Sequence, residues 1–225
     1  MKIFSSLFKK LPDRTQLEEF LQSITLEQPQ KVYRSMKKES LRLPAALSVL
    51  ALYLAHRFAV GLRQTLTSVD KSTKAKEKFA YDAVAFEAAA FCHYRLMQDV
   101  LDHLDVEVED EIYFEYLKDS ATITSSLFVG KTPFSLPREL LLTRSMAYSH
   151  EEKFNSVRPD EKFAKFLISS IQSGTPTVRS HVSASSSLSL QLSIISYVPI
   201  FESTLLDEFK KVARDMFLAD REGSL

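Results

Sequence analysis

FAYDAVAFEAAAFCHYRLMQDVL, the stretch at residues 79–101, decides the fold of this chain. It contains no glycine or proline and is rich in alanine, so a helix is its most favourable conformation. Apolar residues cover nearly every side of that helix, and such a helix is buried, because no side can face water without exposing phenylalanine or leucine. One acid, Glu87, lies in its middle. We therefore expect a central core helix that carries a carboxyl group into the interior.

A second apolar stretch, residues 44–66, precedes this helix. Pro44 stands where the first turn of a helix tolerates proline. The segment between the two stretches, residues 67–78, is polar and is typical of a turn followed by exposed helical residues. Residues 44–66 and 79–101 are therefore predicted to form an antiparallel pair of hydrophobic core helices.

The rest of the chain is expected to be helical as well. Only 4 of the 225 residues are glycine, and glycine supplies the backbone conformations that hairpin turns and phosphate-binding loops require. The hydrophobic content of 45% is sufficient for a sizeable core. We predict an all-α fold with a single domain, residues 1–225, in which about seven to nine helices form a bundle around the central pair.

Charge and cysteine content restrict the partners and the compartment. Lys+Arg 29 balance Asp+Glu 29, so we expect no nucleic-acid partner. The single cysteine, Cys92, excludes an internal disulfide and fits a reducing compartment, from which we expect a cytoplasmic protein. Residues 1–11 lack the apolar core of a signal peptide. The longest nearly uncharged run, residues 43–55, is shorter than the roughly 20 residues that span a bilayer, so we expect no transmembrane segment.

Motifs that carry enzyme chemistry are missing from the sequence. No histidine follows a glutamate by three residues, which excludes the usual Glu-x-x-His pair of a dimetal bundle. Gly130, Lys131 and Thr132 match the end of a phosphate-binding loop, but Ser125 replaces the glycine that such a loop needs. We expect no catalytic residue, no metal and no cofactor, and we favour a non-enzymatic protein.

The polar residues within the two apolar helices are the candidate site. Arg57 lies level with residue 84 in the antiparallel pair, within one turn of Glu87, and we predict that the two form an ion pair, because a buried carboxylate needs a partner. This group either fixes the register of the helices or lines a pocket for a small ligand of unknown identity. The candidate ligand-binding residues are Glu87, Arg57, His56, His93, Tyr53 and Asp82.

Two further segments have more than one interpretation. Residues 1–11 predict an amphipathic helix, which either packs on the protein or contacts a partner or a membrane surface. Its candidate contact residues are Ile3, Phe4, Leu7 and Phe8. Residues 183–198 alternate apolar and polar side chains like a strand, but Leu188, Leu192 and Ile195 also fit one face of a helix. We interpret this segment as a serine-rich helix that bends or ends at Pro199.

Three functions are compatible with these features. The first is a non-enzymatic, soluble helical interaction or scaffold protein, which binds a protein partner or self-associates as a homo-oligomer. The second is a small-molecule-binding protein or an enzyme that uses the buried polar cluster around Glu87 and Arg57. The third is a peripheral membrane protein that makes a weak surface contact through its N-terminal helix.

Overall fold

Helices form every regular element in the part of the chain that the computed structural model describes, which comprises residues 14–69, 80–103, 110–128, 138–150, 158–174 and 188–221. In chain order the elements are α2 (Arg14–Gln22), α3 (Gln28–Ser35), a 3-10 turn (Glu39–Leu41), α4 (Arg42–Val69), α6 (Tyr81–Asp102), α7 (Asp110–Phe128), α8 (Arg138–His150), α9 (Pro159–Ser173), α10 (Leu188–Phe201), a π-helical turn (Glu202–Leu206) and α11 (Asp207–Arg221). The predicted all-α fold is confirmed.

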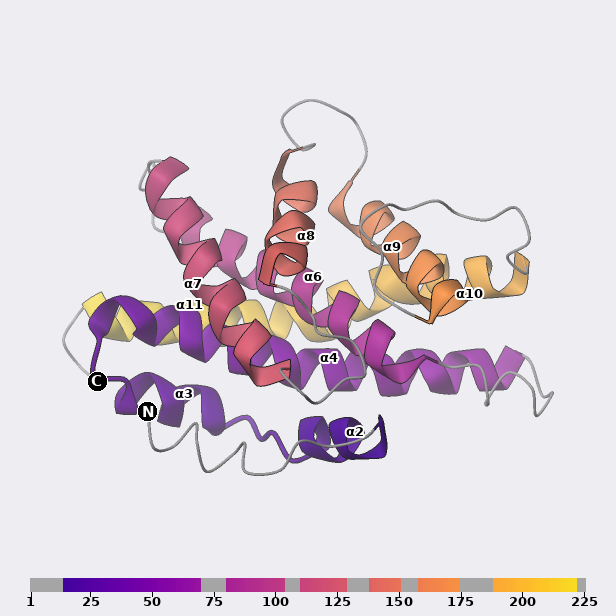
Figure 1. Ribbon diagram of the computed structural model, residues 1–225, viewed down its shortest axis with the longest axis horizontal. Coiled ribbons are helices and arrows are strands. Elements are labelled where there is room, and N and C mark those ends of the chain that lie inside the picture. Colours follow the sequence, from indigo (N-terminus) through magenta and orange to yellow (C-terminus); the bar gives the residue numbers. More distant parts are fainter. Residues whose placement is uncertain are drawn as a thin grey trace.

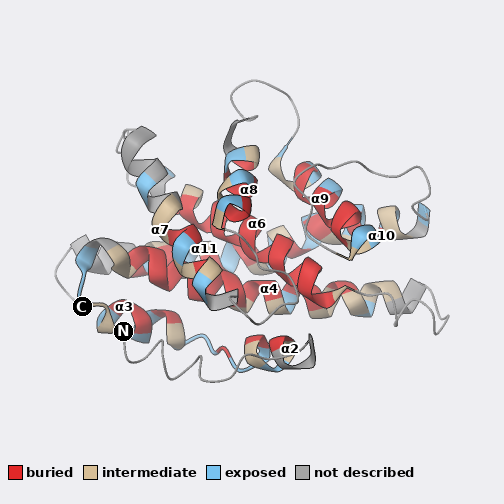
Figure 2. Ribbon diagram, viewed as in Figure 1, coloured by how far each residue is buried: buried red, intermediate tan, exposed pale blue. Residues whose placement is uncertain are grey.

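The two apolar stretches form the centre of the molecule. α4 runs along its length, and α6 returns across it in the opposite sense (Figure 1). Residues 43–52 of α4 and 81–94 of α6 are all buried, and the buried residues in Figure 2 follow these two helices. The predicted central pair, residues 44–66 and 79–101, therefore corresponds to α4 and α6.

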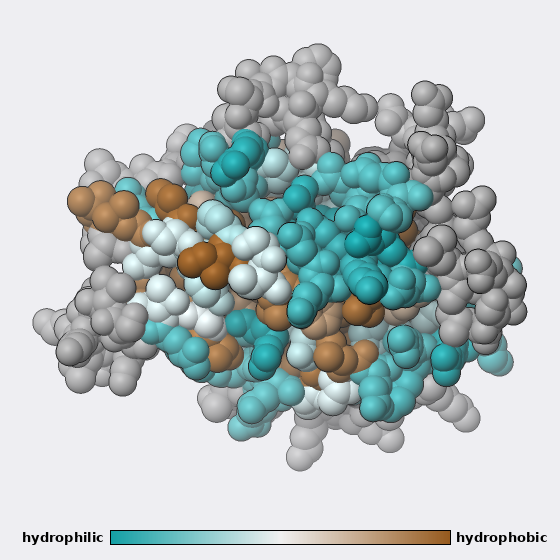
Figure 3. Space-filling model, turned by 180° about the vertical axis from the view of Figure 1, so that it is seen from behind, coloured by the Kyte–Doolittle hydropathy of each residue, from teal (hydrophilic) through white to brown (hydrophobic). Residues whose placement is uncertain are grey.

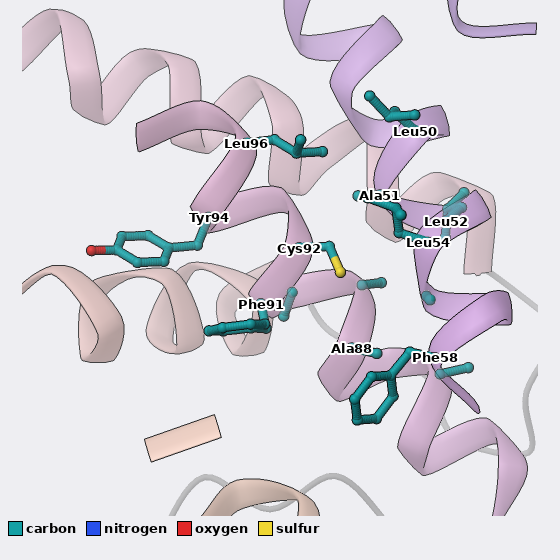
Figure 4. Packing of buried hydrophobic residues seen from close by; sticks show 14 of the residues in the cluster. Leu50, Ala51, Leu52, Leu54, Phe58, Ala88, Phe91, Cys92, Tyr94 and Leu96 are labelled. Carbon is teal, nitrogen blue, oxygen red and sulfur yellow. The ribbon is translucent and has the colours of Figure 1, made fainter. Parts of the chain in front are cut away.

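Two different faces of α6 are buried against different neighbours. Cys92 and Leu96 point toward α4, whereas Phe91 and Tyr94 point away from it (Figure 4). On that other side the ring of Phe91 stacks on Phe163 of α9, with the centroids 4.2 Å apart. α6 is thus enclosed by helices on two sides, which explains why its sequence is apolar around the whole helix.

The segment of uncertain conformation is helical where the structure describes it. Residues 188–198 belong to α10, as predicted, and residues 183–187 lie outside the described residues. Pro199 lies inside α10, which ends at Phe201. Of the two expected outcomes at Pro199, the end of the helix is therefore wrong, and the bend stays a prediction. The chain continues through the π-helical turn, where Ser203 and Thr204 donate hydroxyl hydrogen bonds of 3.3 and 2.6 Å to the carbonyl of Ile200. These bonds satisfy an acceptor at the irregular turn.

α10 is held against α4 by an aromatic group. The ring of Phe58 on α4 lies 5.2 Å from Tyr197 and 4.9 Å from Phe201, measured between centroids. The hydroxyl of Tyr197 lies over Gly61, where a Cβ atom would overlap it and would come within 2.8 Å of the Tyr197 Cζ atom. The absence of a side chain at Gly61 therefore lets α10 approach α4 closely.

One helix among the described residues is long and apolar enough to cross a membrane. It is the part of α4 at Arg42–Leu66. An 18-residue window within this stretch has a mean hydropathy of 1.6, and 72% of that window is buried within the protein. Its apolarity is that of a core helix covered by other helices. The described residues contain no second helix of this kind, so they do not form a multi-span membrane protein.

Candidate functional site

Glu87 is buried in an ion pair with Arg144 of α8. The Arg144 Nε atom donates to Glu87 Oε2 at 2.8 Å, and Nη2 donates to Oε1 at 2.7 Å. Neither side chain is exposed. Ser170 of α9 donates a third hydrogen bond of 2.8 Å to Oε1, and the Arg144 guanidinium lies 3.8 Å from the ring centroid of Phe166. One carboxylate therefore links α6, α8 and α9.

The predicted pair between Glu87 and Arg57 is wrong. Glu87, Phe91 and Tyr94 follow one another at spacings of four and three residues, which places them on one face of α6. The rings of Phe91 and Tyr94 contact Tyr148 of α8, so this face meets α8 and α9 rather than α4. Arg57 is exposed on α4. The sequence places Arg57 within one turn of Glu87 along the helix pair, but it does not show which way each side chain points.

Burial and hydrogen bonding shift the pKa of Glu87 in opposite directions. Complete burial raises the pKa of Glu87 above its ordinary value, because the charged form loses its hydration. The hydrogen bonds from Arg144 and Ser170 act in the opposite direction, since they stabilise the carboxylate. The two parallel bonds make the pair bidentate, and its full enclosure separates both charges from water.

Other predicted site residues have different neighbours. His56 Nδ1 lies 2.7 Å from the hydroxyl of Tyr81, at the start of α6. The ring of Tyr53 packs against Phe209 of α11, with the centroids 5.5 Å apart. Burial lowers the pKa of His56. The two side chains therefore make contacts with α6 and α11 that do not involve Glu87.

Asp82 and His93 are both buried on α6, with 5% and 6% of their surface exposed. The Nε2 atom of His93 has no hydrogen-bond partner among the described residues, and burial lowers the pKa of this side chain to about 4. Within the same residues, no three histidine, cysteine, aspartate or glutamate side chains are grouped so that they could hold a metal ion. A ligand-binding role for the predicted residues stays a prediction. Ile3, Phe4, Leu7 and Phe8 lie outside the described residues.

α10 presents an exposed apolar surface that sequence reasoning did not identify. Leu188 is 70% exposed, and Leu192 and Ile195 are each 55% exposed. Together with the exposed Pro199 they form what we call the α10 seam, in which successive residues are four, three and four positions apart. Figure 3 shows this side of the molecule, with hydrophobic side chains standing among residues of intermediate hydropathy. The sequence places Leu188, Leu192 and Ile195 on one face of a helix, but helical periodicity alone does not show whether that face is buried or exposed.

A groove lies beside the seam, between α9 and α10. It encloses about 330 Å³ and has an apolar lining of Ala164, Ile168, Ile195, Val198 and Pro199. Its rim carries charges of both signs: Arg158 pairs with Asp160 at 2.8 Å, and Lys165 stands nearby. A second, more polar cleft of about 520 Å³ continues from it along the π-helical turn. The groove can accept an apolar side chain next to the seam.

Comparison with protein families, with characterised proteins and with solved structures finds no match to this chain.

Proposed function

We propose that this protein is a non-enzymatic helical interaction protein and that the α10 seam binds a helix of a protein partner. The observation that carries the proposal is the exposure of Leu188, Leu192 and Ile195 at helical spacing on one element. Isolated apolar residues are common on protein surfaces, whereas several large apolar residues gathered on one face of an element favour a contact surface.

The spacing of the seam indicates which structure it binds. Apolar residues that alternate at four and three positions form the contact line between two packed helices, because this spacing keeps one side of each helix facing the other. Ser196 is exposed beside this line. A small side chain at the edge allows a second helix to approach closely.

α10 offers this surface in a fixed position. Its opposite side is buried, with Ile194, Val198 and Phe201 at most 3% exposed. The contacts of Tyr197 with Phe58 and Gly61 hold it on α4. A surface that is already ordered loses little conformational entropy when a partner binds, which favours affinity.

The interior of the protein also supports the proposal of a non-enzymatic interaction protein. Glu87 and Arg144 are fully enclosed, and neither of the two clefts at α9 and α10 is lined by either of them. The exposed stripe, in contrast, leaves large aliphatic side chains in water, at a cost that a bound helix would remove.

Photo-cross-linking in the producing cells tests the proposal. A photoreactive residue at position 192 should give a discrete covalent adduct whose cross-linked peptide carries apolar residues three or four positions apart. The adduct should disappear when Ile195→Asp is added. Position 143, which is exposed on α8, is the matched control and should give no such adduct. Adducts only with lipid, or equal adducts at both positions, would contradict the proposal.

A further inference from the structure

We infer that the helix bound by the α10 seam is α10 of a second copy of this chain, packed antiparallel about a two-fold axis. The inference rests on the proposed function, because it names the partner of the same surface. In this arrangement Leu192 lies opposite Ile195 of the second copy, and Leu188 lies opposite its Pro199.

The first argument is the symmetry of the spacing. The intervals along the seam are four, three and four residues, so they read the same in both chain directions. An interface around a two-fold axis brings the same surface patch from both copies together, with each residue repeated in reverse order. A palindromic spacing allows each seam residue to lie opposite a seam residue of the second copy.

The second argument is charge. α10 contains no acidic or basic residue from Leu188 to Phe201. Two copies therefore bring no like charges face to face along the seam, a contact that is destabilising wherever it occurs. At the rim of the groove, Arg158 and Lys165 accompany Asp160 and Glu161, so both signs are present there. The seam itself therefore carries no charge that would favour a charged partner helix over the uncharged α10.

The third argument is the fit between Leu188 and the groove. Leu188 is 70% exposed, more than any other large hydrophobic side chain among the described residues. In the antiparallel register it arrives at Pro199 of the other copy, where the groove is lined by Ala164, Ile168 and Val198. Two such insertions, one at each end of the seam, bury the most exposed large hydrophobic side chain among the described residues of each chain. They also explain why the groove lies beside this end of α10.

The size of the seam predicts the strength of the dimer. Four residues and one groove per copy form a small contact compared with stable interfaces, so the dimer is expected to be reversible and to accumulate as the protein concentration rises.

Analytical ultracentrifugation of the full chain with paired charge variants tests this inference. Leu192→Lys and Ile195→Glu each place a charge at the dimer axis and should each give a monomer at concentrations where the native chain dimerises. Both sites are exposed, so both variants should keep the native helical circular dichroism spectrum. An equal mixture of the two should dimerise again, because the introduced lysine of one copy then faces the introduced glutamate of the other across the axis. Leu26→Lys alters an exposed leucine outside α10, 47% exposed, and should leave association unchanged.

Each contrary result contradicts one part of the inferred dimer. If the single variants remain dimeric, α10 is not the dimer contact. If they are monomeric and their mixture stays monomeric, the antiparallel register is wrong. If the native chain is monomeric throughout while cross-linking from position 192 still captures a helix of another protein, the second copy is rejected but the proposed function stands. If that cross-link is absent as well, both are rejected.

Discussion

Arg144 and Glu87 meet through two parallel hydrogen bonds of 2.8 and 2.7 Å at a point where neither side chain is exposed. The two residues lie on α8 and α6, and Ser170 adds a bond from α9. Because a charge at this depth is tolerable only with its partner in place, the correct packing of these three helices is coupled to one ion pair.

Replacing Arg144 by methionine should lower the free energy of unfolding by about 3–5 kcal/mol, because it leaves the Glu87 carboxylate buried without its partner. Urea denaturation monitored by circular dichroism measures the change. The double variant Glu87→Leu with Arg144→Met should recover most of the loss, since it removes both charges. A single variant as stable as the native protein would show that the pair does not hold α6 and α8 together.

Ser170→Ala should lower the free energy of unfolding by about 1–3 kcal/mol, because the Glu87 carboxylate loses a hydrogen bond in a site that water does not reach. The matched control is Ser173→Ala on the same helix. Ser173 is exposed, and its hydroxyl donates 2.9 Å to the carbonyl of Ser169 within α9. Equal effects of the two substitutions, measured by urea denaturation, would contradict the role of Ser170.

Gly61→Ala should destabilise the protein by about 1–3 kcal/mol, because the new methyl group overlaps the Tyr197 hydroxyl and pushes α10 away from α4. Alanine normally stabilises a helix relative to glycine by about 1 kcal/mol. In the background of Tyr197→Leu, which removes the overlapping atoms, the same substitution should therefore be neutral or stabilising. Thermal unfolding of the native chain, Gly61→Ala, Tyr197→Leu and the double variant measures whether the effect of Gly61→Ala on stability changes sign. A loss that persists without Tyr197 would locate the strain elsewhere.

His93 should make the protein less stable in acid. The unfolded chain binds a proton at this histidine near pH 6.5, whereas the native protein binds it only near pH 4. The unfolded state therefore holds more protons between these values, and the native state loses up to about 3 kcal/mol as the pH falls through this window. His93→Gln should flatten that slope in urea denaturation at a series of pH values. His103→Gln, at an exposed histidine, is the control. Parallel slopes for the native chain and His93→Gln would reject this assignment.

The central pair of helices could be predicted from the sequence because residues 79–101 admit no other arrangement. Absence of glycine and proline favours a helix, and apolar residues on every side require burial. The partner of Glu87 could not be predicted from the positions of Arg57 and Glu87 along the antiparallel helix pair. Neighbouring residues on a helix point about 100° apart, so two residues at a similar height can face in different directions. Glu87 shares a face with Phe91 and Tyr94, but apolar residues lie on every side of α6, so only the structure shows that this face meets α8.

The α10 seam could not be predicted for a different reason. Leu188, Leu192 and Ile195 have the composition of a core face, and periodicity does not distinguish a face that packs within the chain from one that packs against another molecule. Only the position of α10 on the outside of α4 and α9 shows that these side chains remain exposed.

Hydroxyl-radical footprinting of the native chain over a range of protein concentrations tests the central claim, that the α10 seam is covered by a second copy. The modification rates of Leu188, Leu192 and Ile195 should fall together as the concentration rises. The rate of Leu26, an exposed leucine outside α10, should stay constant. Rates at the seam that do not depend on concentration, or that change in step with Leu26, would contradict the claim.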